Sequence, residues 1–192
     1  MGDGPVLALP RSRSIFMHNL FFNLVICGLV SSTLQAQSSF PQIVGETTEG
    51  NSVTLPDNSG SDYTIVALAY GKKAEPLLER WYGPAYSRFI AKNGLFAATY
   101  HAELYLVPIF VGLNRSAYNG SMNRLRKEVD PEIARRVIFV KDDPRDLIRT
   151  LDMTDKDIPY FFVLDRNGKI LQRVSGAFSV DRLDALEAPM LK

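Results

Sequence analysis

The sequence predicts an α/β fold in which helices flank a central mixed sheet. Two observations carry this prediction. From residue 63 onward, apolar strand-like stretches alternate with amphipathic helical stretches, which is typical of parallel strands joined by helices. The last two strand-like stretches are joined by an Asn-Gly turn, so a closing hairpin adds antiparallel pairing at one edge. At 192 residues, one domain is expected.

The first 36 residues have the layout of a secretory signal peptide. Arg11 and Arg13 precede the apolar run 20–30, and small and polar residues follow it. The run is too short for a comfortable membrane-spanning helix. We therefore expect cleavage after Ala36, an exported (periplasmic or extracellular) protein and no stable membrane span after cleavage. An uncleaved membrane anchor is the alternative.

Cys27 is the only cysteine in the sequence and lies inside the apolar run. Once the signal peptide is removed, the chain can form no disulfide, although it enters an oxidising compartment. Of 22 basic and 21 acidic residues, only Arg11, Arg13 and Asp3 lie before residue 37, so the remaining charge is near zero. This balance argues against bulk electrostatic binding to nucleic acid or anionic membranes.

After the signal peptide, residues 37–62 form an N-terminal extension with a short edge strand at Val53 and Leu55, and residues 63–192 form the main domain. The first strong strand is 63–70, an apolar run expected to be covered on both faces. A helix begins near Glu75, with Pro76 at its first position. Its core stripe is predicted at Leu77, Trp81, Ala85 and Phe89. A kink is predicted at Gly83-Pro84.

Two further strand–helix units follow. The strand 104–111 contains Pro108, which indicates a bulge or a strand end. A helix capped by Ser116 comes next, and the strand 137–140 then precedes a short helix opened by Asp143-Pro144. The core-facing residues of the two helices are predicted to be Tyr118, Met122, Leu125, Val129, Leu147, Ile148 and Leu151.

The C-terminal part reads as a hairpin followed by a helix. Ile158-Pro159 leads into the strand 160–164, the turn 165–168 and the strand 169–174. Ser179 caps a last helix with Val180, Leu183 and Leu186 on one face. Gly168 supplies the positive φ that a tight turn needs.

The Ile158-Pro159 hairpin, its Asp165–Lys169 turn and the strand–loop–helix at 63–90 resemble the thioredoxin-like superfamily over about residues 40–190. The layout is that of thiol-disulfide oxidoreductases and peroxiredoxins, which insert an extra strand–helix unit before the hairpin. The resemblance implies a cis bond at Pro159 and a Cys-x-x-Cys at the start of the first helix, where the helix dipole activates the thiol. Here 72–76 reads Lys-Lys-Ala-Glu-Pro instead.

The missing cysteines indicate a redox-inactive thioredoxin-like protein that acts as a polypeptide-binding or assembly module. The loop before Pro159 would leave backbone groups free to pair with an extended polypeptide of an exported protein. The residues expected to line or border this binding groove are Lys72, Lys73, Trp81, Tyr82, Ile158 and Pro159. The strand–loop–helix also resembles the cysteine-free domain of the mitochondrial ATP synthase assembly chaperones, through Trp81 and Pro84.

Two alternatives stay open: an oxidoreductase with atypical chemistry, and a degenerate structural domain without a ligand groove. The enzyme alternative is disfavoured because Cys27 is embedded in the signal. No catalytic residue, cofactor or metal site is predicted, since His101 with Glu103 is too little to hold a metal. The basic cluster Arg124, Arg126, Lys127, Arg135 and Arg136 is expected to be a solvated helix face rather than a nucleic-acid site.

Overall fold

The computed structural model describes residues 39–57, 60–92, 99–110, 118–140 and 142–191, together with Gly2. The predicted signal peptide 1–36, Cys27 and the predicted cap Ser116 lie outside the described residues. Residues 35–192 belong to one compact unit. None of the helices in the described part is long and apolar enough to cross a membrane.

A four-stranded mixed sheet forms the centre of this unit. It runs in the order β4 (Ala102–Pro108), β3 (Tyr63–Ala69), β6 (Tyr160–Asp165) and β7 (Ile170–Ser175). β3 pairs in parallel with β4 and antiparallel with β6, which in turn pairs antiparallel with β7. β3 and β6 are buried along nearly their whole length because both faces of the sheet are covered. The predicted mixed sheet is thus confirmed.

A second, three-stranded sheet continues from the β4 edge. Its antiparallel strands are β2 (Ser52–Leu55), β1 (Ile43–Thr47) and β5 (Ile138–Phe139). Parallel bridges from Leu106 to Val137 and from Ile109 to Val140 place β5 next to β4. This is the extra strand of the inserted unit. β1 was not predicted, because its exposed and half-buried residues show no alternating pattern.

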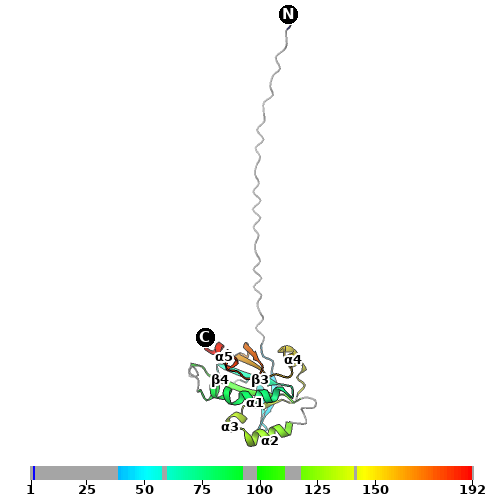
Figure 1. Ribbon diagram of the computed structural model, residues 1–192, viewed down its shortest axis with the longest axis vertical. Helices are drawn as coiled ribbons and strands as arrows, with labels where there is room; N and C mark the ends of the chain where they lie inside the picture. Colours follow the sequence, from blue (N-terminus) through cyan, green and yellow to red (C-terminus); the bar gives the residue numbers. More distant parts are fainter. Residues whose placement is uncertain are drawn as a thin grey trace. The chain divides into compact units, whose positions relative to one another are not determined.

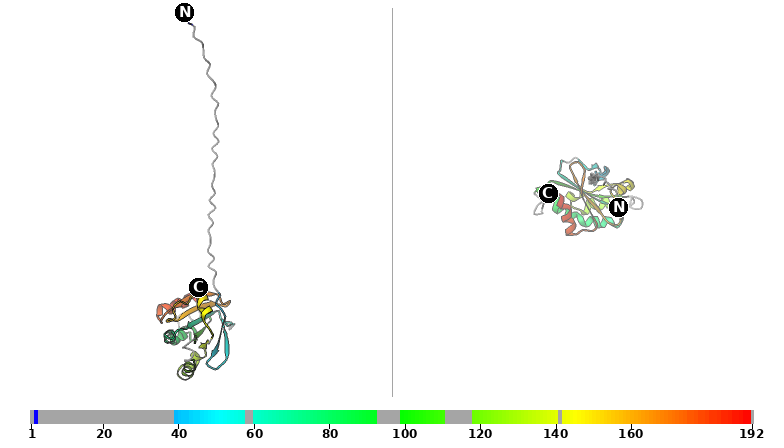
Figure 2. Two further views of the ribbon diagram at one scale, coloured as in Figure 1. Left: turned by 90° about the vertical axis from the view of Figure 1, so that its right-hand side faces the viewer. Right: turned by 90° about the horizontal axis from the view of Figure 1, so that it is seen from above.

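Helices cover the central sheet on both faces. They are α1 (Ala74–Ala85), α2 (Tyr118–Glu128), α3 (Pro131–Ala134), α4 (Arg145–Thr150) and α5 (Val180–Glu187). One core cluster joins β3, β4 and β6 to α1, α2 and α5, and the other joins them to α4 and the β1–β2 hairpin. α1 lies along β3 and β4 (Figure 1), and α5, in red, lies beside the orange β6–β7 hairpin (Figure 2).

The first helix contains the predicted Pro84 and changes geometry there. Pro84 has no N–H for the Arg80 carbonyl, and α1 passes into the π-helical turn Tyr86–Ile90, where Ala91 N donates to Tyr86 O at 2.9 Å. The buried stripe contains Leu78 rather than the predicted Leu77. The other three predicted positions, Trp81, Ala85 and Phe89, are buried, so a strict spacing of four misplaced only the first, where the 3.6-residue period gives Leu78.

The C-terminal hairpin is built as predicted. Asp165 Oδ1 accepts from Asn167 N at 2.8 Å and from Lys169 N at 3.0 Å, and Gly168 has a φ of +74°. The predicted cap is also confirmed, since Ser179 accepts from Arg182 N. Val180, predicted to face the core, is 59% exposed because it lies at the first position of α5, where the helix has not yet turned onto the sheet.

Candidate functional site

The place that the resemblance assigns to the redox cysteines lies between the end of β3 and the start of α1. Gly71, Lys72 and Lys73 form this loop, and Gly71 O accepts from Ala74 N at 2.9 Å and from Glu75 N at 3.3 Å. These bonds begin α1, whose N-terminus carries partial positive charge. Lys72 and Lys73 are exposed there, so the position holds two ammonium groups in place of thiols.

The loop before β6 meets this one directly. An ideal Cβ on Gly71 would lie 1.8 Å from Lys156 O, so only glycine allows the two backbones to approach so closely. Lys73 Nζ pairs with Asp157 Oδ2 at 2.9 Å. Asp157 N donates to Asp155 Oδ1 at 2.8 Å, which fixes the turn that presents this carboxylate. The predicted groove between the two loops is therefore closed by contact.

Electrostatics at this contact favour the charged pair. The hydrogen bond to Asp157 and the charge of that carboxylate raise the pKa of Lys73 above its usual value. Both side chains reach solvent, with 78% of the Lys73 side chain and 39% of the Asp157 side chain exposed. Water and salt screen such pairs, so this bridge closes the site without making a large contribution to stability.

The residue that the resemblance singles out, Pro159, differs from expectation in one respect. The cis X-Pro bond of the described residues is Leu55–Pro56, and Ile158–Pro159 is trans, so the implied cis bond is wrong. Trans is the intrinsically favoured form of an X-Pro bond. Pro159 is buried, Ile158 is half-buried, and Pro159 O accepts from Gly176 N at 2.9 Å. The backbone carbonyl is thus engaged by the end of β7.

Trp81, predicted both in the core stripe and at the border of the groove, is a core residue, and so is Tyr82, which was predicted only at the border. Trp81 is fully buried, its ring centroid lies 4.1 Å from that of Phe161, and its Nε1 donates to Gly176 O at 3.2 Å. Tyr82 is 7% exposed, and burial raises the pKa of its hydroxyl. They lie on the sheet-facing side of α1, so they support the loops and offer no surface to a ligand.

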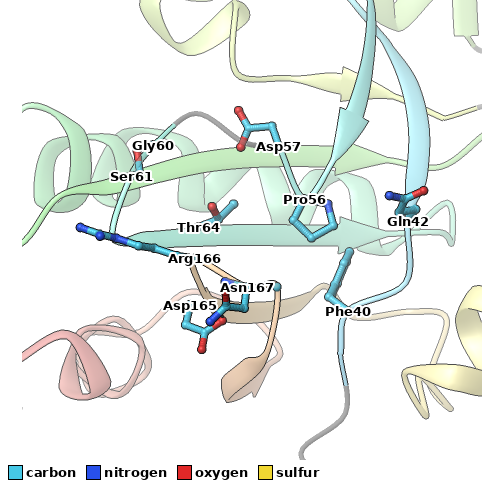
Figure 3. Close-up of a pocket in the computed structure, with 11 residues that line it drawn as sticks. Phe40, Gln42, Pro56, Asp57, Gly60, Ser61, Thr64, Asp165, Arg166 and Asn167 are labelled. Carbon is cyan, nitrogen blue, oxygen red and sulfur yellow. The ribbon is translucent and has the colours of Figure 1, made fainter.

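A hollow that the sequence did not indicate lies at the opposite end of β3 and β6. It measures about 510 Å³ and is open on one side. Figure 3 shows its lining residues, with Thr64 of β3 between Arg166 and Pro56. Sequence reasoning recognised only the turn formers there, since the hollow forms between segments that lie far apart in the chain. It is lined by Phe40, Gln42, Pro56, Asp57, Gly60, Ser61, Thr64, Asp165, Arg166, Asn167 and Gly168.

Charged groups at this hollow are held by the protein itself. Arg166 pairs with Asp62 and lowers the pKa of that carboxyl. Asp57 Oδ2 accepts from Tyr105 O–H at 2.5 Å, and burial, followed by this bond, raises the pKa of Tyr105. Within the described residues, Asp57 Oδ1 is buried without a hydrogen-bond partner.

The remaining candidates show no site chemistry. Within 39–57, 60–92, 99–110, 118–140 and 142–191, no three His, Cys, Asp or Glu side chains are placed to hold a metal ion. Four arginines of the basic cluster have intramolecular partners, as expected of a solvated helix face. These pairs are Arg124 with Glu79, Arg126 with Thr48 O, Arg135 with Glu132 and Arg136 with Glu103.

Comparison with solved structures identifies the fold. The thioredoxin domain of a thiol-disulfide oxidoreductase from Bacteroides vulgatus superposes with a TM-score of 0.51 at 17% identity, over 80% of this chain and 96% of that one. The chain has a thioredoxin-like fold. No protein-family model matches the sequence. No curated protein matches it either.

Two further solved structures share the thioredoxin-like fold. A thiol:disulfide interchange protein from Bacteroides sp. has a TM-score of 0.53 at 16% identity, over 81% of this chain and 90% of that one. The pneumococcal exposed lipoprotein thioredoxin from Streptococcus pneumoniae has a TM-score of 0.53 at 15% identity, over 79% and 98%. The further resemblance to the mitochondrial ATP synthase assembly chaperones gains no support from these neighbours and stays a prediction.

One departure separates this chain from the redox chemistry that its neighbours' names describe. The thioredoxin-like domain contains no cysteine, because the single cysteine of the sequence is Cys27. A thiolate is the nucleophile of disulfide exchange. The domain is consistent with a redox-inactive member of the fold, and Lys72 and Lys73 lie at the start of α1, where the resemblance places the cysteine pair.

Proposed function

We propose that the chain is an exported, redox-inactive thioredoxin-like protein that binds an extended polypeptide where residues 71–73 meet residues 155–159. The observation that carries this proposal is the Lys73–Asp157 pair across two loops that meet without a thiol. The two ammonium groups at the start of α1 give this place the charge that a binding site for carboxylates uses.

The chemistry of the site favours an acidic segment. Lys72 and Lys73 add two positive charges to the N-terminus of α1, which itself favours anions. A carboxylate of the bound polypeptide would take the place of Asp157 on Lys73. Because the bridge is largely exposed, exchanging one carboxylate for another costs little. Separation of the two side chains then exposes the backbone beside Ile158 for pairing with the ligand.

Export is part of the same proposal. The basic, apolar and small segments of residues 1–36 support it. One neighbour in fold is described as an exposed lipoprotein, which agrees with an extracytoplasmic setting for this fold. The partner is accordingly an exported polypeptide, met in the periplasm or outside the cell.

The test is crosslinking mass spectrometry on the extracytoplasmic fraction of cells that express the wild type, Lys73→Glu or Lys127→Glu. Lys127 is exposed on α2, so its variant is a matched charge change outside the site. We expect Lys73→Glu to lose polypeptide crosslinks to residues 71–75 and 155–159 and Lys127→Glu to keep them. Unchanged crosslinks in Lys73→Glu would contradict the binding role.

N-terminal sequencing of the same native protein tests the export part. We expect the chain to begin at Gln37, with Cys27 removed. A protein that keeps Cys27 would contradict cleavage and would restore the thiol alternative. Absence of any specific crosslink in the wild type would favour the degenerate structural domain.

A further inference from the structure

One edge of the central sheet is left open in the described structure. β7 is the last strand of the order β4-β3-β6-β7, and no described strand pairs with it on its outer side. Gly176 N donates to Pro159 O, so hydrogen-bonded positions alternate from there along the β6–β7 ladder. The backbone N–H and C=O groups of Arg173 and Ser175 therefore point away from β6. Open strand edges of this kind are templates for a further strand.

The beginning of this edge already accepts an extended segment. Ser39 forms an antiparallel bridge with Lys169, and Phe40 N donates to Gly168 O at 2.8 Å. These contacts lie immediately before β7 on the same outer side of the hairpin. They show that the backbone here has the geometry for antiparallel addition.

The side chain that would usually guard such an edge is drawn away from it. Arg173 is the only charged residue of β7, and charged side chains commonly block edge pairing. Its Nη2 donates to Asp152 O at 2.6 Å, and its guanidinium lies 5.2 Å from the centroid of the Tyr160 ring. The guanidinium is thus held over the face of the sheet. The backbone edge stays accessible, and the guanidinium beside it shares a loose, solvent-exposed ion pair with Asp152, whose Oδ2 lies 3.6 Å from Nη1.

We infer that the outer edge of β7 binds an extended polypeptide of another protein as an added antiparallel strand, with a carboxylate of that strand opposite Arg173. Opposite charges facing one another across strands are stabilising, and like charges are destabilising. A second copy of this chain paired about Arg173 would set two guanidinium groups against each other. Charge complementarity therefore selects an acidic, otherwise apolar or β-branched segment over self-pairing. This edge is separate from the Lys73–Asp157 site.

The probe is a capped hexapeptide, Thr-Val-Glu-Val-Thr-Val, added to the full chain and followed by amide hydrogen exchange. We expect slower exchange at residues 170–176 and about fivefold weaker binding of the Thr-Val-Lys-Val-Thr-Val peptide, as expected from one cross-strand charge pair. A Glu peptide with alternate amides N-methylated should not bind, because it cannot complete the ladder. These three peptides test the edge without altering the protein.

Variants of the protein test the same charge pair by changing Arg173 instead of the peptide. We expect Arg173→Glu to prefer the Lys peptide, Arg173→Gln to distinguish the two peptides poorly, and the matched charge change Arg135→Glu, just after α3, to behave as wild type. Lys73→Glu should leave peptide binding at β7 unchanged, which separates this inference from the proposed function. Binding without protection of 170–176, equal affinity for the two peptides, or a β7-linked dimer of the chain alone would overturn it.

Discussion

The two ends of the β3–β6 strand pair are built in opposite ways. At the end where the resemblance places the cysteine pair, Gly71 lies against the Lys156 carbonyl and Lys73 pairs with Asp157. At the other end, Pro56, Asp57, Gly60 and Ser61 line a hollow of about 510 Å³ together with the turn 165–168. The layout of the strands thus does not fix where the open space lies. The contacts between the loops at each end determine where the open space lies.

The largest effect should come from removing the aromatic support of the closed end. Trp81→Ala removes a fully buried ring packed on Phe161 and its bond to Gly176 O, so we expect a loss of about 3–5 kcal/mol in the free energy of unfolding. Denaturant unfolding measures it. Phe40→Ala, at the hollow end, should cost less because water can occupy part of the space that it leaves. Equal losses would contradict the contrast between the two ends.

The backbone contact of the closed end is tested by a pair of glycine substitutions. In Gly71→Ala the new methyl meets Lys156 O at 1.8 Å, and we expect a loss of about 1–3 kcal/mol or partial unfolding of the loop. Gly83→Ala is the matched control, since outside its chain neighbours and its own helix backbone nothing lies within 4 Å of its added Cβ, and it is exposed on α1. There the better helix propensity of alanine is opposed by the contact of its Cβ with the ring of Pro84, so we expect a change of less than about 1 kcal/mol. Similar effects at both positions would rule out a close contact at Gly71.

These substitutions also mark what the sequence could and could not predict. The turn at Asp165–Gly168, the interruption of α1 at Pro84 and the end of β4 at Pro108 follow from local rules, because one or two residues fix the backbone there. The contact between Gly71 and Lys156 joins segments far apart in the chain. Neither segment carries a local signal for it, so it was predicted as an open groove.

The same limit explains the misassigned site residues. Trp81 was predicted both in the core stripe and at the border of the groove, and Tyr82 only at the border. α1 turns both side chains toward the sheet, so the core prediction for Trp81 is confirmed. An apolar spacing shows which side chains share a face of a helix but not how close that face lies to a distant loop. Lys72 and Lys73 lie in the loop before α1, as predicted.

A smaller effect should appear at the closed end in alkali. The pKa of Lys73 is raised by Asp157, so the stability from this pair is fully present below the ordinary lysine value of 10.5 and is lost as the pH rises through the higher folded-state pKa. We therefore expect the stability difference between wild type and Lys73→Met to shrink above about pH 10.5. Thermal unfolding at neutral and alkaline pH measures it. A difference that grows in alkali would contradict the pair.

The smallest effect should appear at the hollow end in acid, with the opposite sign. Arg166 lowers the pKa of Asp62, so the stability from this pair is present above the ordinary carboxyl value of 3.8 and is lost as the pH falls through the lower folded-state pKa. We expect the stability difference between wild type and Asp62→Asn to vanish below that pH, and salt to reduce it at every pH. Asp62→Asn should show no such loss in alkali, because arginine keeps its charge where lysine loses it. An alkaline loss confined to the Lys73 pair would establish that each end is held separately, and an alkaline loss shared by both pairs would instead indicate that one charge network couples them.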